Sequence, residues 1–193
     1  MDQVKVFKNC ISSNDAQSII DYINKNQNSF SHGPENLRFT KKFGRDNAIA
    51  NKGQSQEVIT GIDEIEDKIK LVVDLLIKYT SDSFQENKDL YLASLWLAKQ
   101  VSGASFIGHS DTGGGNLQFA YTAILYLNTL SKSSPLEFPN LNINIMPFAG
   151  DLVIFRSEEF HKVELINEDR YSIAICFTKD KEYDLKFGSD RVI

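Results

Sequence analysis

GDLVIFRSEEFHKVELINEDRYSIAICFT, residues 150–178, contains three short apolar runs that decide the fold class. Each run is rich in aromatic and β-branched residues, and polar residues separate one run from the next. The runs cover Asp151–Arg156, His161–Leu165 and Tyr171–Thr178. Short runs of this composition, without helical periodicity, are typical of consecutive β-strands. We therefore expect the C-terminal half of the chain to be built from strands.

The same pattern extends back to residue 90. Five more runs precede the quoted stretch at steps of about ten to fifteen residues, with Gly, Ser, Asn and Pro between them. They cover Leu90–Val101, Phe106–Asp111, Phe119–Asn128, Leu136–Phe138 and Ile143–Pro147. Eight short strands with no helix between them predict a double-stranded β-helix (jelly roll) or a barrel.

Two helices are expected before residue 90. Apolar residues recur at helical spacing in Asp15–Lys25 and again in Ile62–Tyr79. A short strand is expected over Val4–Ile11, and the long polar region 26–60 contains one possible strand, Leu37–Phe43. The predicted fold class is therefore mainly β with flanking helices (α+β), in which the N-terminal helices support one sheet.

Length and charge limit what the chain can do. With 193 residues, a mass of 21.8 kDa and no internal repeat, it is long enough for one domain and short for two. No apolar run approaches the roughly 20 residues of a membrane span, and the first residues do not resemble a secretory signal. The net charge of −5 argues against a nucleic-acid partner. We expect a cytoplasmic protein with reduced cysteines and without membrane or nucleic-acid partners.

A His-x-Asp motif lies in one of the expected strands. Side chains at positions i and i+2 of a strand point to the same face, so His109 and Asp111 would offer an imidazole and a carboxylate to one cavity. His161 begins another expected strand 52 residues later and is the candidate third ligand. Two histidines and one carboxylate form the facial triad of non-heme Fe(II) oxygenases. The plain alternative is a chance motif, with His161 a surface or core-edge residue.

An arginine opens the last expected strand. Arg170 stands nine residues after His161 and precedes an apolar run. Burying its charge is costly unless an anion meets it, and its planar fork suits a carboxylate of a small dicarboxylic cosubstrate. The alternative is a salt bridge to Glu164 or Glu168.

Six motifs over roughly residues 95–178 together resemble one enzyme family. In order they are His109-x-Asp111, Tyr126-Leu127-Asn128, Leu136-Glu137-Phe138-Pro139, Gly150-Asp151-Leu152-Val153-Ile154-Phe155, His161-x-Val163 and Arg170-x-Ser172. This order resembles the 2-oxoglutarate- and Fe(II)-dependent dioxygenases of the prolyl 4-hydroxylase type. The resemblance implies a single dioxygenase domain over residues 1–193, with helical support and a substrate-loop region in 1–89, a jelly-roll catalytic core in 90–178 and a C-terminal tail in 179–193.

The resemblance also implies a set of site residues. His109, Asp111 and His161 would bind Fe(II). Arg170 would hold the distal carboxylate of 2-oxoglutarate, with the hydroxyl of Tyr126 and a further hydrogen bond from Ser172. A core tyrosine without chemistry is the alternative for Tyr126.

The activity implied by the resemblance is hydroxylation. The expected reaction consumes O2 and 2-oxoglutarate, hydroxylates a prolyl residue of a peptide or protein and releases succinate and CO2, with ascorbate as a possible reductant. Hydroxylation of a free amino acid or another small metabolite with the same cofactors is the alternative. Asp111 weighs against a halogenase, and the triad together with Arg170 weighs against a jelly-roll binding protein. The oligomeric state stays open.

Some positions depart from the family's usual residues. Gln100 and Phe106 stand where tyrosines are frequent, and Cys176 stands where tryptophan is frequent. Two segments are candidates to close over a substrate, residues 29–60 and residues 112–116. The alternative for both is an ordinary surface loop.

Overall fold

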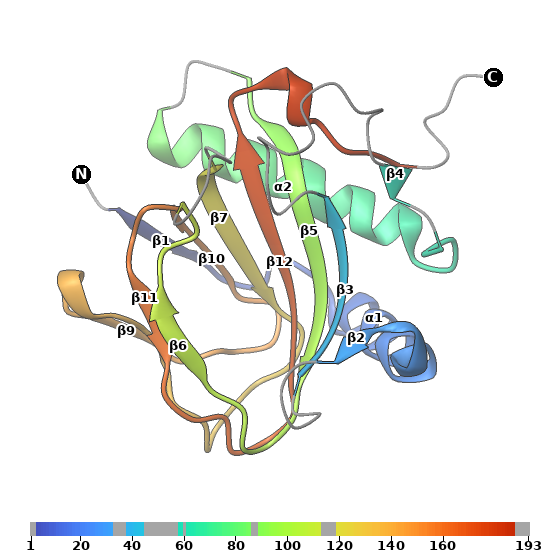
Figure 1. Ribbon diagram of the computed structural model, residues 1–193, viewed down its shortest axis with the longest axis vertical. Helices are drawn as coiled ribbons and strands as arrows, with labels where there is room; N and C mark the ends of the chain where they lie inside the picture. Colours follow the sequence, from blue (N-terminus) through green and yellow to red (C-terminus); the bar gives the residue numbers. More distant parts are fainter. Residues whose placement is uncertain are drawn as a thin grey trace.

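The computed structural model describes residues 3–32, 38–44, 58–59, 61–85, 89–112 and 119–187. The larger of its sheets has seven strands (Figure 1). In spatial order they are β1 (Val4–Phe7), β10 (Leu152–Arg156), β7 (Phe119–Tyr126), β12 (Arg170–Thr178), β5 (Tyr91–Gln100), β3 (Arg38–Gly44) and β2 (Ser31–His32). Every neighbouring pair in this sheet is antiparallel.

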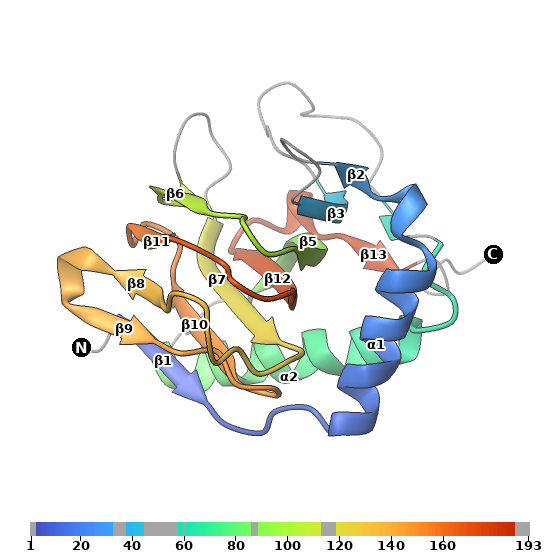
Figure 2. The ribbon, with the colours of Figure 1, turned by 90° about the horizontal axis from the view of Figure 1, so that it is seen from below.

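A smaller, four-stranded sheet faces the larger one (Figure 2). Its antiparallel strands, in spatial order, are β6 (Phe106–His109), β11 (His161–Val163), β8 (Leu136–Phe138) and β9 (Ile143–Ile145). A 3-10 turn, η4 (Pro139–Leu141), joins the last two strands in sequence. The predicted jelly-roll architecture is confirmed, and the eight strands expected between residues 90 and 178 are all present with ends within two residues of those expected.

Helix α1 (Ser13–Lys25) begins and ends close to where its pattern predicts. The hydroxyl of Ser12 accepts a hydrogen bond from the backbone N–H of Asp15 and so caps the helix. The apolar stripe is buried, with Ile19 and Ile23 fully inaccessible to solvent. A 3-10 turn, η1 (Gln27–Ser29), follows.

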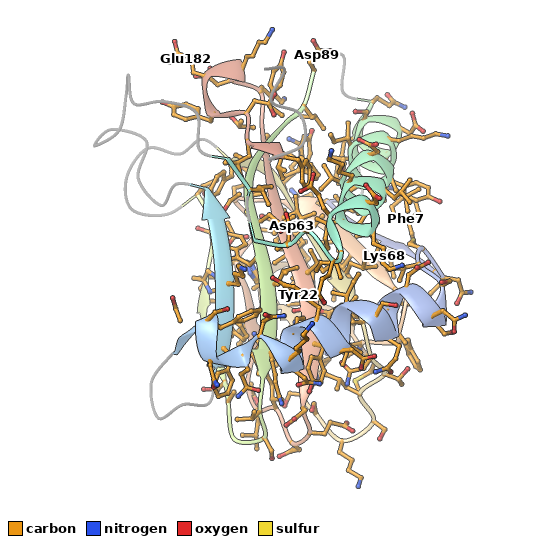
Figure 3. The ribbon with its side chains drawn as sticks, turned by 90° about the vertical axis from the view of Figure 1, so that its right-hand side faces the viewer. Phe7, Tyr22, Asp63, Lys68, Asp89 and Glu182 are labelled. Carbon is orange, nitrogen blue, oxygen red and sulfur yellow. The ribbon has the colours of Figure 1, made fainter. Side chains whose placement is uncertain are left out.

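Helix α2 (Glu66–Phe84) is shifted from the predicted range Ile62–Tyr79. Residues 62–65 form a turn instead of a first helical turn, because the N–H of Ile65 bonds to the carbonyl of Ile62 at 2.8 Å. The helix then continues past the predicted end to Phe84, and the left-handed backbone of Gln85 ends it. Lys68 of α2 reaches α1, with 3.0 Å between its ammonium and the Asp15 carboxylate (Figure 3).

Two apolar clusters lie on opposite faces of the larger sheet. One joins the helices to the outer face and includes Ile19, Ile69 and Leu125. The other fills the space between the two sheets and includes Ile124 and Tyr126. Successive residues of β7 belong to different clusters, because side chains alternate between the two faces of a strand. Every second side chain of β7 therefore points into the space between the sheets.

The C-terminal residues that the structure describes pack against the core. Residues 179–187 contain η5 (Lys181–Tyr183) and β13 (Lys186–Phe187), which pairs in parallel with β4 (Val58–Ile59). Leu185 and Phe187 are buried in the outer apolar cluster. Within the described ranges, neither α1 nor α2 is long and apolar enough to cross a membrane.

The outer cluster supplies a stability prediction. Ile19→Ala should lower the free energy of unfolding by about 2–5 kcal/mol, because it leaves a cavity between α1 and the sheet. Urea denaturation followed by circular dichroism measures this change. The matched control is Gln17→Ala, an exposed position on the same helix, which should change the free energy by less than about 0.5 kcal/mol. Equal effects of the two variants would contradict the assigned packing.

Candidate active site

Three potential metal ligands meet at the edge of the smaller sheet. His109 is the last residue of β6, His161 is the first residue of β11, and the two are paired across the antiparallel strands. Asp111 was expected on the same strand as His109, and that expectation is wrong, because β6 ends at His109. A turn brings Asp111 back toward the histidines instead, and its backbone N–H bonds to the carbonyl of Ser157 at 2.8 Å.

The distances between these side chains suit a shared ion. The Asp111 carboxylate lies 3.5 Å from Nε2 of His109 and 4.0 Å from Nε2 of His161, and one potential ligand atom from each residue lies within 4.8 Å of the others. Two imidazole nitrogens and one carboxylate oxygen are the donor set of the facial triad. The sequence-predicted trio is therefore brought together in space.

Buried hydroxyl groups hold the Asp111 carboxylate. Thr122 of β7 donates a hydrogen bond of 2.7 Å to Oδ2, and its own hydroxyl lies 2.9 Å from that of Ser157. Burial alone would raise the pKa of Asp111, but hydrogen bonds from His109 and Thr122 and the nearby imidazole of His161 outweigh burial and lower it. The carboxylate is therefore ionised at neutral pH.

The ring of His161 is fixed in one orientation. Its Nδ1 lies 3.0 Å from the carbonyl oxygen of Glu159, to which it donates, so the neutral ring presents the lone pair of Nε2 to the site. The ring of Phe155 packs edge-on against it with 4.8 Å between ring centres. Burial lowers the pKa of His161 despite the opposing effect of Asp111, which favours the neutral, ligating form. His109 is more open, with 44% of its side chain exposed.

Arg170 is buried, and no carboxylate among the described residues pairs with it. Only 3% of the residue is exposed, and its Nη2 donates to the hydroxyl of Tyr126 at 3.3 Å. Its Nε has no hydrogen-bond partner among the residues that the structure describes. The guanidinium carbon lies 5.0 Å from the centre of the Tyr126 ring and 5.8 Å from that of Phe106. Aromatic faces stabilise the cation in part, but a buried arginine of this kind still favours an anionic ligand.

The salt-bridge alternative for Arg170 is not formed. Glu164 pairs with Lys162 at 2.6 Å, and the Glu168 carboxylate accepts hydrogen bonds from the backbone N–H groups of residues 131–132. Within the described part of the chain, no carboxylate forms an ion pair with Arg170. Its charge is therefore left for a ligand.

One cavity connects the trio with Arg170. It has a volume of about 290 Å³ and lies between the two sheets. Its lining comprises Thr40, Trp96, Ala98, Gln100, Phe106, His109, Asp111, Thr122, Ile124, Leu136, His161, Lys162, Val163, Arg170, Ser172 and Ala174. Ser172 lines the cavity, whereas Tyr126 is completely buried behind it and contacts Arg170. Burial raises the pKa of Tyr126, so its hydroxyl stays protonated.

Thr122 was missed in the sequence. It shares the inner face of β7 with Ile124 and Tyr126, and counting back by twos from Tyr126 would have placed it there. The predicted loop closures fall mostly outside the described residues. Positions 113–116 are not described, and of 29–60 the structure describes only 29–32, 38–44 and 58–59.

Comparisons with known proteins give likenesses of structure alone. No family model and no curated protein matches the sequence. An oxidoreductase of the 2OG-Fe(II) oxygenase family from Burkholderia pseudomallei superposes with a TM-score of 0.70 at 11% identity, over 92% of this chain and 85% of the other. A prolyl hydroxylase from Trichoplax adhaerens, solved with a peptide fragment of the hypoxia inducible factor oxygen degradation domain, gives a TM-score of 0.69 at 18% identity, over 94% and 86%.

A third neighbour was solved with a small molecule. HygX from Streptomyces hygroscopicus, in complex with nickel, 2-oxoglutarate and hygromycin B, gives a TM-score of 0.60 at 13% identity, over 93% of this chain and 84% of the other. The chain therefore has the jelly-roll fold found in 2-oxoglutarate- and Fe(II)-dependent oxygenases.

Proposed function

We propose that this protein is a 2-oxoglutarate- and Fe(II)-dependent oxygenase that hydroxylates a prolyl residue of a peptide or protein. One observation carries the proposal: a His–Asp–His trio lines the same cavity as a buried arginine that has no carboxylate partner among the described residues. The first feature suits a divalent ion and the second suits a dicarboxylate. Neither feature is needed by a protein that only binds a partner through its surface.

The trio fits Fe(II) by its donors and their support. His161 presents Nε2 because its Nδ1 is engaged, and Asp111 is ionised and held by Thr122. Such outer contacts orient metal ligands. When bound, Fe(II) and 2-oxoglutarate supply the oxidation, in which O2 is consumed, 2-oxoglutarate becomes succinate and CO2, and one oxygen atom enters the substrate.

The protein's own residues bind and orient the reactants. Arg170, backed by Tyr126, would hold the distal carboxylate of 2-oxoglutarate, and Ser172 would add a hydrogen bond. Apolar lining residues such as Ile124 and Val163 exclude water from the space between the two ends. The metal site and the site for the distal carboxylate thus lie in one cavity.

The size of the cavity suits a substrate that places one small group in it. A volume of about 290 Å³ lies just below the usual range for small-molecule sites. Beside a five-carbon cosubstrate, this volume leaves space for a group such as one prolyl ring. The motifs also resemble those of prolyl 4-hydroxylases. A free amino acid or another small metabolite is the competing substrate class, and the hygromycin B complex of HygX is an example of a small-molecule ligand on this fold.

Turnover with a mixed substrate pool tests the proposal. The protein is incubated aerobically with Fe(II), 2-oxoglutarate, ascorbate and either proline-containing peptides or free amino acids, and succinate and the gain of one oxygen atom are followed by mass spectrometry. Oxygen gained by peptides alone supports the prolyl proposal. Oxygen gained by free amino acids alone would replace it with the small-molecule function. If the protein neither released succinate nor bound Fe(II) under any condition, both functions would be overturned.

Support of the metal ligand by Thr122 gives a second prediction. Thr122→Val keeps the shape of the side chain but removes the hydroxyl that holds Asp111, so affinity for Fe(II) or Mn(II) should fall by about 10–100-fold. Anaerobic calorimetric titration with either ion measures the affinity. Thr122→Ser keeps the hydroxyl and should stay within about threefold of the original protein. Equal metal affinities of the two variants would contradict the role of the Thr122 hydroxyl in holding Asp111.

A further inference from the structure

Two buried polar atoms lack hydrogen-bond partners in the part of the chain that the structure describes. They are Nε of Arg170 and Oε1 of Gln100, and each residue is 3% exposed. Buried polar side-chain atoms in proteins nearly always have a partner, and each exception requires an explanation. An anionic ligand would supply a partner for Arg170, whereas Oε1 of Gln100 still lacks one.

The two residues are direct neighbours. Gln100 ends β5, Arg170 begins β12, and the two are paired across these antiparallel strands. Side chains on one face at paired positions lie about 5 Å apart at Cβ. Both side chains line the cavity. Their side chains therefore lie at the same end of the cavity. Thr122, which holds Asp111, is paired with Cys176 farther along β12, so this end is the one away from the His–Asp–His trio.

We propose that Gln100 is a further binding residue for the distal carboxylate of the cosubstrate, an inference that rests on the proposed function. A half-turn of the terminal amide exchanges its oxygen and its NH2 group without changing the shape of the side chain. After that turn, the amide N–H and Arg170 both donate to one carboxylate. The ligand thus supplies the acceptor that the guanidinium lacks, and the turned amide oxygen accepts from the neighbouring guanidinium.

The neutrality of Gln100 matters as much as its hydrogen bonds. No described carboxylate neutralises Arg170, so this end of the cavity keeps a positive charge that attracts an anion. A glutamate at position 100 would have the same shape but would pair with Arg170 and occupy the place of the ligand's charge. An amide next to the arginine donates to a carboxylate without competing with it.

The isosteric change Gln100→Glu tests this role through binding, without turnover. Mn(II)-loaded protein is titrated anaerobically with 2-oxoglutarate and, separately, with 2-oxopentanoate, which has the same 2-oxoacid end but no distal carboxylate. Gln100→Glu should weaken 2-oxoglutarate by at least about 100-fold and change 2-oxopentanoate by less than about threefold. Gln100→Met, which only removes hydrogen bonds, should weaken 2-oxoglutarate by about tenfold. The control Gln3→Glu, an exposed position just before the edge strand β1, should leave both affinities unchanged.

Thermal stability gives an independent readout. Without ligand, Gln100→Glu should keep or raise the melting temperature, because the new carboxylate pairs with a buried cation. A lower affinity for 2-oxoglutarate together with an undiminished melting temperature supports the role. Affinities of Gln100→Glu and Gln100→Met within threefold of the original protein would overturn it, as would equal losses for both oxoacids. Failure of the original protein to bind 2-oxoglutarate would instead overturn the proposed function, and the inference with it.

Discussion

Replacing Asp111 with alanine is expected to weaken the binding of Fe(II) or Mn(II) by more than about 100-fold, and with it to abolish turnover. The variant leaves two imidazoles and no anionic ligand at the edge of the smaller sheet. Loss of a supporting contact alone costs 10–100-fold in many metal sites, so loss of a ligand should cost more. Anaerobic calorimetric titration of the protein with the ion measures the change in affinity directly.

The fold should survive this substitution. Asp111 lies in a turn, 14% exposed at its side chain, and its backbone hydrogen bond to Ser157 does not depend on the carboxylate. The control is Asp63→Ala, an exposed acidic position before α2, which should leave metal affinity unchanged (Figure 3). If Asp111→Ala bound the ion within threefold of the original protein, the trio would not be the metal site.

The strands were predictable because their signal is local. Apolar and β-branched residues fill short segments such as residues 152–156, and polar residues interrupt them, so composition alone separates one strand from the next. The start of α2 was not predictable in this way. Ile62 and Ile65 continue the helical spacing of the apolar residues but lie in a preceding turn, and the burial of both side chains accounts for their apolar character in either conformation.

The grouping of His109, Asp111 and His161 was anticipated for a reason that is only partly right. Alternation along a strand was expected to align His109 with Asp111, whereas the chain leaves the strand at His109 and a turn supplies the alignment. The pairing of His109 with His161 depends on how two distant strands meet. No local sequence pattern predicts this pairing of His109 with His161. Only the order of the motifs, through the family that it resembles, indicated that the two histidines meet. The hydrogen bond from Thr122 depends on the same long-range pairing.

Replacing Arg170 with methionine should have opposite effects on binding and on stability. Affinity for 2-oxoglutarate should fall by more than about 100-fold, because removing one partner of a buried charge pair costs about 3–5 kcal/mol. The free energy of unfolding without ligand should stay the same or rise, because a buried cation with an unpartnered Nε is replaced by an apolar side chain of similar length. Anaerobic calorimetry with Mn(II)-loaded protein and urea denaturation of the ligand-free protein measure the two quantities.

Two further variants separate charge from geometry at this position. Arg170→Lys keeps the positive charge but loses the planar fork, so its affinity for 2-oxoglutarate should lie between those of the original protein and Arg170→Met. Arg156→Met removes an arginine from the end of β10, outside the cavity, and should leave the affinity unchanged. Mn(II) affinity should be the same in all three variants, because none of these side chains belongs to the trio. A loss of stability in Arg170→Met with unchanged 2-oxoglutarate binding would mean that the arginine serves the core, and that its unpartnered nitrogen is not a ligand site.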